Sequence, residues 1–421
     1  MIRLFLLLVT VGFVNLASAR ELEVTSELRD DLGTIDERDA LEAKAYTEAF
    51  EGEARSEKIR FSRACEAGRH FVIGAVGDVL LHQALAVQGM SRREGYRSLW
   101  AEIEPEMKRP TFMYANLEGP AAGPVSSAGR PVADPGAHFD KVAYTSYPMF
   151  NYRPDLVNDL VESGVDVVST ANNHSLDRRA LGVDRTIEAL LRAGLPYTGT
   201  RSVAETLKNP PEKTDWSTVT EKDGLRVAWV ACTFSTNGIP DKNLQVLQCF
   251  EQRAIVLAEI RRLRADPTID AVIATPHWGL EYEHVPGADQ KRLAREMVDA
   301  GAMIVFGNHP HVLQPIERIT AKDGHEGYVI YSLGNFVSGQ KGVAKRTTAL
   351  ITVGLTKNAR GEVFVNGARH LPLAMMYGDD GLMVRPAKGN FEEARLLANQ
   401  LLAGSTEIAP GEPLVTNLGC R

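Results

Sequence analysis

Several apolar segments of this sequence end in side chains that can bind a metal ion or move a proton. The residues at these ends are Asp78, Asn116, Glu118, Asn172, Asn173, His174, His277, His309, His311 and Asn335. A single histidine after an apolar run is usually a hydrogen-bonded core residue. Five or more such coincidences at the same point of successive segments are hard to explain in that way, so they indicate one shared site.

These side chains offer oxygen and imidazole nitrogen atoms and no thiolate. Such ligands suit Mn²⁺, Fe or Zn²⁺ at a reactive site rather than a structural zinc or an iron–sulfur cluster. The set is larger than one tetrahedral ion needs. We therefore expect two divalent metal ions that activate a hydroxide for attack on phosphorus or a similar centre.

The elements that must position these residues follow an α/β pattern, in which short apolar runs alternate with helical segments. The expected strands are residues 70–78, 111–118, 165–174, 225–233, 271–279, 302–311 and 328–336. The clearest helices, at 154–164, 183–194 and 288–301, each end in a glycine suited to a left-handed C-cap. Ligands bind at the carboxyl ends of strands in α/β sheets, which is where the chemistry-bearing residues lie.

Two further segments have distinct patterns. Residues 119–150 are rich in Gly, Pro, Ala and Ser, which predicts a long loop. Beyond about residue 345 the sequence alternates, which predicts antiparallel strands with one solvated face.

The stretch VFGNHPHV, residues 305–312, places two histidines on either side of a proline. Proline favours an extended conformation at the residue before it, here His309. In extended backbone, residues two apart point to the same side. The pattern predicts that His309 and His311 face one way, as a rigid clamp at the end of a strand.

The first 19 residues have the features of a secretory signal: Arg3, an apolar run, and a small-x-small site at Ala17–Ala19. The expectation is cleavage and export to the periplasm or cell envelope, with an uncleaved anchor as the alternative. We expect a charged helical extension over residues 20–69 and a C-terminal tail over residues 386–421. The net charge of −7 argues against a nucleic-acid partner.

All four cysteines lie in the part expected to be exported, where disulfides form. Cys232 and Cys249 flank a loop-like stretch and are a natural pair, which leaves Cys65 with Cys420 to tie the two ends together. Four ordinary buried thiols are the alternative.

Six ordered motifs resemble the bacterial capsule synthesis proteins of the CapA type, which are linked to poly-γ-glutamate and related to the calcineurin-like metallophosphoesterases. The motifs are GDVLLH (77–82), NLEGP (116–120), STANNHSLD (169–177), TPHWGLEYEH (275–284), GNHPHVLQPIE (307–317) and YSLGNFVSG (331–339). The resemblance covers roughly residues 70–376. It implies a CapA-like domain over 70–385 with a four-layer α/β/β/α sandwich of the metallo-dependent phosphatase type.

The resemblance also implies roles for single residues. The implied metal ligands are Asp78 for the first ion, Glu118 as a bridge, Asn173, His277 and His309 for the second ion, and His311 for the first. His174 would be the general acid. Asp177 could orient its imidazole, or could instead cap the following helix.

Other residues are expected to face substrate. These are His82, Asn116, Glu281, Tyr282 and Asn335. For an anionic substrate, cations are available around Arg130 and near Lys341 and Lys345, but no pattern singles one out. His284 is expected in a surface loop.

Three positions depart from the phosphoesterase pattern. His82 comes four residues after Asp78 instead of two, Glu118 replaces an aspartate, and Ser175 follows His174 where an acid is usual. Whether the protein is an enzyme therefore stays open, with a metal-dependent hydrolase as the leading expectation.

The functional expectation is a role in the biosynthesis of an anionic envelope polymer. The partners would be the polymer or a phosphorylated precursor, together with membrane subunits of a synthase or exporter. The first alternative is a non-catalytic, metal-stabilised subunit of such a complex. The second is an exported phosphatase or nucleotidase unrelated to capsule.

Overall fold

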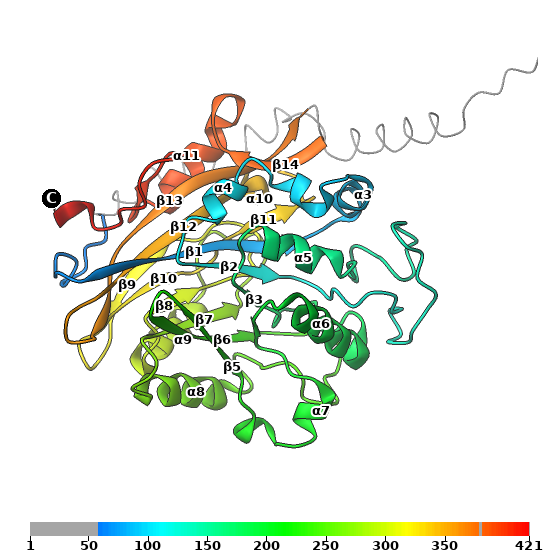
Figure 1. Ribbon diagram of the computed structural model, residues 1–421, viewed down its shortest axis with the longest axis horizontal. Coiled ribbons are helices and arrows are strands. Elements are labelled where there is room, and N and C mark those ends of the chain that lie inside the picture. Colours follow the sequence, from blue (N-terminus) through cyan, green and yellow to red (C-terminus); the bar gives the residue numbers. More distant parts are fainter. Residues whose placement is uncertain (1–57, 379–380, 421) are drawn as a thin grey trace, which may run out of the picture.

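The computed structural model describes residues 58–378 and 381–420 (Figure 1). The expected signal peptide and most of the charged extension lie outside these ranges. Among the described residues, no helix combines the length and the apolar character that a membrane crossing requires.

The first of two sheets contains nine strands. Its main path runs β14-β13-β12-β1-β2-β3-β4, with β11 added beside β1 and β15 beside β13. The strands are β1 Arg69–Leu80, β2 Phe112–Leu117, β3 Val167–Ser169, β4 Tyr197–Thr198, β11 Asn335–Ser338, β12 Thr347–Lys357, β13 Val363–Gly378, β14 Gly381–Pro386 and β15 Thr406–Glu407. Strands β1 to β4 are mutually parallel, whereas β12, β13 and β14 pair antiparallel.

The second sheet contains six strands in the order β5-β6-β7-β8-β10-β9. They are β5 Ser217–Lys222, β6 Leu225–Thr233, β7 Ala271–His277, β8 Ile304–Phe306, β9 Ile316–Thr320 and β10 Glu326–Ile330. Strands β6, β7, β8 and β10 are parallel, so their carboxyl ends meet at one edge.

The two sheets pack face to face over an apolar core. Ile73 and Tyr114 of the first sheet share one buried cluster with Trp229 and Phe306 of the second. The ring of Tyr114 stacks on both, with centroid distances of 5.9 Å to Trp229 and 5.8 Å to Phe306. Because strands such as β6 are also covered on their other face, they read in sequence as continuous apolar runs.

Helices cover both outer faces (Figure 1). Those packed on the nine-stranded sheet are α3 Gln83–Ser91, η1 Gly95–Leu99, α4 Glu104–Met107, α5 Asp155–Glu162 and α6 Arg179–Ala193. Those on the six-stranded sheet are α8 Arg253–Ala265 and α9 Ala288–Ala300. The shorter elements and the last helix are α7 Val203–Thr206, η2 Pro211–Lys213, α10 Val343–Arg346, η3 Gly389–Phe391, α11 Glu392–Leu401 and η4 Leu418–Cys420. The expected α/β/β/α layering is confirmed.

Several local predictions are also confirmed. Helices α5, α6 and α9 are followed by Gly164, Gly194 and Gly301, whose φ angles are +90°, +68° and +121°. No helix or strand of the described chain interrupts the segment between β2 and α5. The prediction of one solvated face for the late antiparallel strands is wrong for β12, which is buried along its length except at Lys357, and for β13, which is buried over most of its length. Strand β12 lies in mid-sheet between β1 and β13, and its inner face meets the second sheet.

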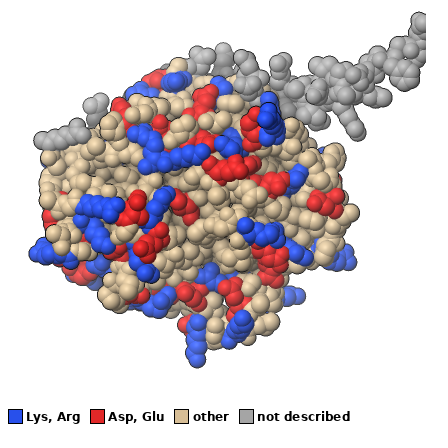
Figure 2. All heavy atoms as spheres, viewed as in Figure 1, with Lys and Arg blue, Asp and Glu red and all other residues tan. Residues whose placement is uncertain are grey.

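Both expected disulfides are present, and the described residues include no free cysteine. Cys65 bonds to Cys420, so the C-terminal tail is tied back to the start of the described chain. The alternative of four buried thiols is wrong. The face shown in Figure 2 intersperses Lys and Arg with Asp and Glu and carries no broad patch of one sign.

Candidate metal centre

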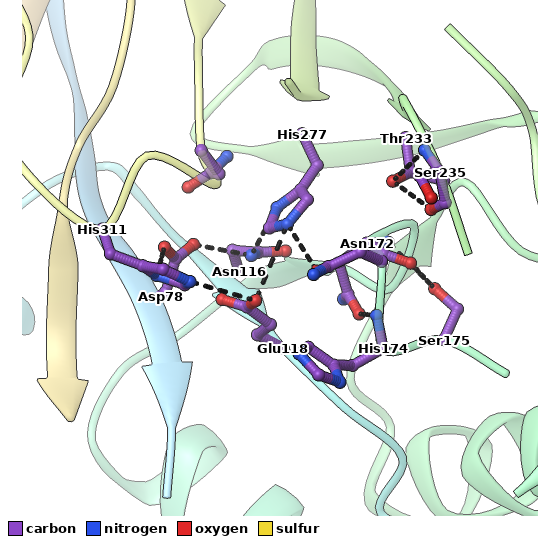
Figure 3. A network of polar contacts seen from close by, with 12 residues as sticks. Asp78, Asn116, Glu118, Asn172, His174, Ser175, Thr233, Ser235, His277 and His311 are labelled. Carbon is purple, nitrogen blue, oxygen red and sulfur yellow. Dashed lines mark hydrogen bonds and ion pairs between the residues drawn. The ribbon is translucent and has the colours of Figure 1, made fainter. Parts of the chain in front are cut away.

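The predicted strand ends meet in space and come from both sheets. Asp78 on β1 lies in register with Asn116 on β2 and with Asn335 on β11. His277, the last residue of β7, forms a bridge with Asn308, just after β8. The sandwich thus brings the carboxyl ends of β1, β2, β7 and β8 to a single buried site (Figure 3).

One group of ligand atoms consists of Asp78, Glu118 and His311, all buried, with one atom from each within 4.8 Å of the others. His311 Nδ1 lies 3.1 Å from Asp78 Oδ2, and His311 Nε2 lies 3.8 Å from Glu118 Oε1. This is the donor set of a site for one divalent ion.

A second group consists of Glu118, His277 and His309, again buried and within 4.8 Å of one another. His277 Nε2 lies 3.7 Å from Glu118 Oε1 and 2.9 Å from Asn173 Oδ1. Figure 3 shows the Glu118 carboxylate between His311 and His277. Glu118 is therefore common to both groups.

The electrostatics of the site favour a bound cation. Glu118 is fully buried, and neither of its carboxylate oxygens has a hydrogen-bond partner in the described part of the chain. Burial, followed by the charge of Asp78, raises the pKa of Glu118 well above its usual value. Burial, followed by neighbouring imidazoles, lowers the pKa of His277 and His309 well below the usual value.

Burying a carboxylate without a partner costs several kcal/mol. Removing one partner of a buried ion pair, for example, destabilises a protein by roughly 3–5 kcal/mol, because the remaining charge is uncompensated. Neutral imidazoles and carboxylates are the forms that bind metals. The unpartnered oxygens of Glu118 and the unpartnered Nδ1 of His309 therefore fit a divalent cation.

Two buried amides hold these ligands in place. Asn116 Nδ2 donates to Asp78 Oδ1 at 2.8 Å and lies 3.3 Å from His277 Nδ1. Asn335 Oδ1 lies 3.1 Å from His311 Nδ1, and Asn335 Nδ2 donates to the His311 carbonyl at 3.2 Å. Such contacts fix the orientation of a ligand. The predicted contact of both amides with substrate remains a prediction.

The backbone at the two histidines differs from its prediction. His309 has φ +99° and His311 has φ +60°, so neither is extended, and the expectation of an extended clamp is wrong. The chain bends sharply after β8, where the Pro310 carbonyl accepts from Tyr282 N. Left-handed backbone at a residue other than glycine costs about 1–3 kcal/mol, and residues in this conformation are concentrated at functional sites. After the bend, His309 joins the group of Glu118 and His277 and His311 joins the group of Asp78 and Glu118, while both also lie within reach of Glu281.

His174 and Asp177 form a buried pair beside the ligand groups. His174 Nδ1 lies 2.8 Å from Asp177 Oδ2, which also accepts from Phe150 N at 2.6 Å. Phe150 contacts the His174 ring edge-to-face at 4.8 Å. Asp177 makes no side-chain cap of α6, so the alternative role as a helix cap is wrong.

The remaining predicted residues lie around the same site. His82 is largely buried; its Nδ1 accepts from Gly339 N at 3.2 Å, and burial lowers its pKa to about 4. Glu281 is exposed, but one carboxylate oxygen lies within 4.8 Å of ligand atoms of His309 and His311. Tyr282 places its ring 6.1 Å from that of His311. His284 is buried, with Nδ1 2.8 Å from the Leu313 carbonyl, so its placement in a surface loop is wrong.

Sequence reasoning missed contributors from the disulfide-closed loop between Cys232 and Cys249. The Phe234 ring lies 4.4 Å from that of His309, and Asn237 Oδ1 accepts from Asn173 Nδ2 at 3.2 Å. The loop pattern contains no signal for these contacts, because they depend on how the two sheets face each other. The cysteines at the two ends of the loop were the sequence feature that could have drawn attention to it.

Comparisons with known proteins agree with the motifs. A family model described as "Bacterial capsule synthesis protein PGA_cap" matches residues 72–340. The chain is similar to "Capsule biosynthesis protein CapA" of Bacillus anthracis, with 30% identity over 288 residues, 67% of this chain and 63% of that protein. It is 29% identical to "PGA biosynthesis protein CapA" of Bacillus subtilis over 290 residues, 68% of each. The chain thus spans slightly less than two thirds of the Bacillus anthracis relative.

Solved structures show a more distant likeness. The NAD nucleotidase of Haemophilus influenzae is 10% identical with a TM-score of 0.41, covering 81% of this chain and 64% of that one. A purple acid phosphatase from yellow lupin is 11% identical with a TM-score of 0.29, covering 83% and 58%. At these TM-scores the likeness adds nothing to the functional argument.

Proposed function

Since this chain belongs to the family of bacterial capsule synthesis proteins, PGA_cap, we propose that it serves in the biosynthesis of an anionic polymer of the cell envelope. We propose further that it is exported, that it holds two divalent metal ions of Mn, Fe or Zn type, and that it is a metal-dependent hydrolase. Its substrate would be the polymer itself or a phosphorylated precursor.

The observation that supports this proposal most strongly is the position of Glu118. Its fully buried carboxylate belongs to both ligand groups and has no hydrogen-bond partner within residues 58–378 and 381–420. Asp78 and His311 complete one group, and His277 and His309 complete the other. A carboxylate shared in this way suits a dinuclear site.

Bound divalent ions would supply Lewis-acid polarisation of a phosphoryl or carbonyl oxygen and would activate water as nucleophile. Side chains of the protein would orient the metal ligands and donate a proton. Asn116 and Asn335 would orient the ligands Asp78 and His311, with which they form hydrogen bonds. His174, held by Asp177, would give a proton to the leaving group from Nε2, because its Nδ1 faces the carboxylate.

One observation favours a second candidate, a metal-stabilised subunit that catalyses nothing itself. The ligands Asp78, Glu118 and His277 are 0% exposed, and His309 and His311 are 3% and 2% exposed. Such burial would also suit an ion that only stabilises the junction of the two sheets. Membrane subunits of a polymer synthase or exporter would then be its partners.

The experiment that separates these candidates is elemental analysis of the purified chain, with an activity screen on the same sample. We expect two metal ions per chain and turnover of phosphoesters or γ-glutamyl polymers that ceases on chelation. Bound metal without turnover across the panel would support the non-catalytic role. Protein that takes up no metal from Mn²⁺, Fe²⁺ or Zn²⁺ would refute both.

Asp177→Asn is expected to lower kcat by about 10- to 100-fold, a part of what a general acid contributes. Asparagine keeps the size of the side chain but removes the negative charge that orients and supports the His174 imidazole. Metal content and thermal stability should stay unchanged. Steady-state kinetics with elemental analysis check this prediction, with Glu188→Gln on the exposed side of α6 as the control. Unaltered kcat would remove His174 from the proposed role.

A further inference from the structure

A half-buried lysine at the mouth of the metal centre has no ion-pair partner among the residues that the structure describes. Lys345, in α10, follows β11 by a few residues. Its Nζ lies 4.8 Å from the ring centroid of Tyr282. Within residues 58–378 and 381–420, Lys345 forms no ion pair.

Both members of this pair are anchored to His311. The Lys345 carbonyl accepts from Asn335 Nδ2 at 3.0 Å, and Asn335 Oδ1 lies 3.1 Å from His311 Nδ1. The Tyr282 ring lies 6.1 Å from the His311 ring, and Tyr282 N donates to the Pro310 carbonyl at 2.8 Å. The position of Lys345 is thus tied to the metal centre by two routes.

A third connection joins Asn335 to Tyr282 through Gln340. Asn335 Nδ2 donates to Gln340 Oε1 at 3.0 Å, and Gln340 Nε2 lies 3.4 Å from the Tyr282 hydroxyl. Tyr282 itself has φ +67°, an uncommon backbone conformation for a tyrosine. Strained residues of this kind persist where surrounding contacts hold them.

Among the described residues, no ion pair joins Lys345 to the carboxylates nearest the site. Glu281 precedes Tyr282, but its carboxylate lies among the ligand atoms of His309 and His311. Asp78 and Glu118 are fully buried within the ligand groups. A half-buried ammonium group without a counter-ion is a site where an anionic ligand gains a charge-assisted hydrogen bond.

The rim beside Lys345 is open to solvent. Tyr282 is 44% exposed, and Leu280, two residues before it, is 72% exposed. The Lys345 ammonium lies over the face of the Tyr282 ring in a cation–π contact. An incoming chain therefore meets the Lys345–Tyr282 pair before it reaches the buried ligands.

We propose that Lys345, held over the face of Tyr282, binds an anionic oxygen group of the substrate, a carboxylate or a phosphate, at the mouth of the metal centre. The pair thereby selects anionic chains over neutral ones. This inference rests on the proposed function, because it concerns substrate at the same site.

The test compares Lys345→Met, which keeps an apolar stem over the ring but removes the charge, with the wild-type chain loaded with Mn²⁺. The probes are penta-γ-glutamate and inorganic phosphate, and the readout is the dissociation constant from calorimetry. We expect Lys345→Met to weaken binding of at least one probe by about tenfold, which corresponds to about 1.4 kcal/mol. Metal content and thermal stability should match the wild type.

Two variants serve as controls. Lys345→Arg keeps the charge and should stay within about threefold of the wild type. Lys208→Ala removes an exposed cation beside α7, far from the site in the fold, and should change nothing (Figure 1).

The pattern of losses identifies the source of the anion. A loss confined to penta-γ-glutamate assigns carboxylate recognition, and a loss confined to phosphate assigns phosphate recognition. Equal affinities of Lys345→Met and wild type for both probes, or no binding by the wild type, would overturn the inference. Lys345-dependent binding without any turnover would instead count against the proposed hydrolysis and leave the anion site standing.

Discussion

Glu118→Gln is expected to abolish metal uptake at both ligand groups and to lower any hydrolytic turnover by about a thousandfold or more. Several kcal/mol of charge stabilisation depend on bound metal, and each 1.36 kcal/mol is a factor of ten in rate. Glutamine matches the size of glutamate but offers no negative charge. Because Glu118 belongs to both groups, one substitution should remove both ions.

The same variant should also lose metal-dependent stability. A ligand that binds only the folded chain stabilises it by about 2.7 kcal/mol when present at a hundred times its Kd. The wild-type Tm should therefore rise on addition of Mn²⁺ and fall on chelation. The Tm of Glu118→Gln should respond to neither, which thermal unfolding with and without metal will show.

His309→Ala provides the matched comparison, because His309 is grouped with Glu118 and His277 but not with Asp78. We expect this variant to retain one ion and Glu118→Gln to retain none, as measured by elemental analysis. If Glu118→Gln keeps two ions, the shared position of Glu118 has no functional meaning.

Removal of the Cys65–Cys420 disulfide by a double substitution to alanine is expected to lower the free energy of unfolding by about 5 kcal/mol. The two cysteines are 355 residues apart in sequence, so the bond restricts nearly the whole unfolded chain. Cys232 and Cys249 are only 17 residues apart, and loss of their bond should cost about 3 kcal/mol. Urea denaturation of both double variants measures the difference.

A second readout separates the two disulfides by function. The loop closed by Cys232 and Cys249 contains Phe234 and Asn237, which contact His309 and Asn173. Its opening should weaken metal binding, whereas loss of Cys65–Cys420 should leave the metal affinity of the folded protein unchanged. A larger stability loss for the 232–249 pair would contradict the chain-entropy argument.

Most elements of the fold could be predicted because their signals are local. Strand β6 occupies the predicted residues 225–233, and α9 the predicted helix up to its terminal glycine. Periodicity and capping residues act within a few positions of each other, so they survive in the sequence. The exposure of β12 could not be predicted in this way, because it depends on neighbours far along the chain.

The candidate site, like the fold, could be predicted only in its local features. Asp78, Glu118, His277, His309 and His311 could be named because each lies near the carboxyl end of an apolar run, where α/β folds place their ligands. Their division into two groups around Glu118 was implied only by resemblance. Pro310 predicted an extended backbone, whereas the structure has a bend at His309 and His311.

The sequence by itself determined the kinds of atom available at the site and the order along the chain of the strands that present them, and it indicated the two cysteine pairs that the structure contains. Only the tertiary structure decided which atoms come within reach of one another. It set Glu118 between His277 and His311, Phe234 against His309, and Lys345 over Tyr282. The physical reason is that these contacts join two sheets and loops far apart in the chain, and their geometry follows from packing the faces of the sandwich, which no local pattern records.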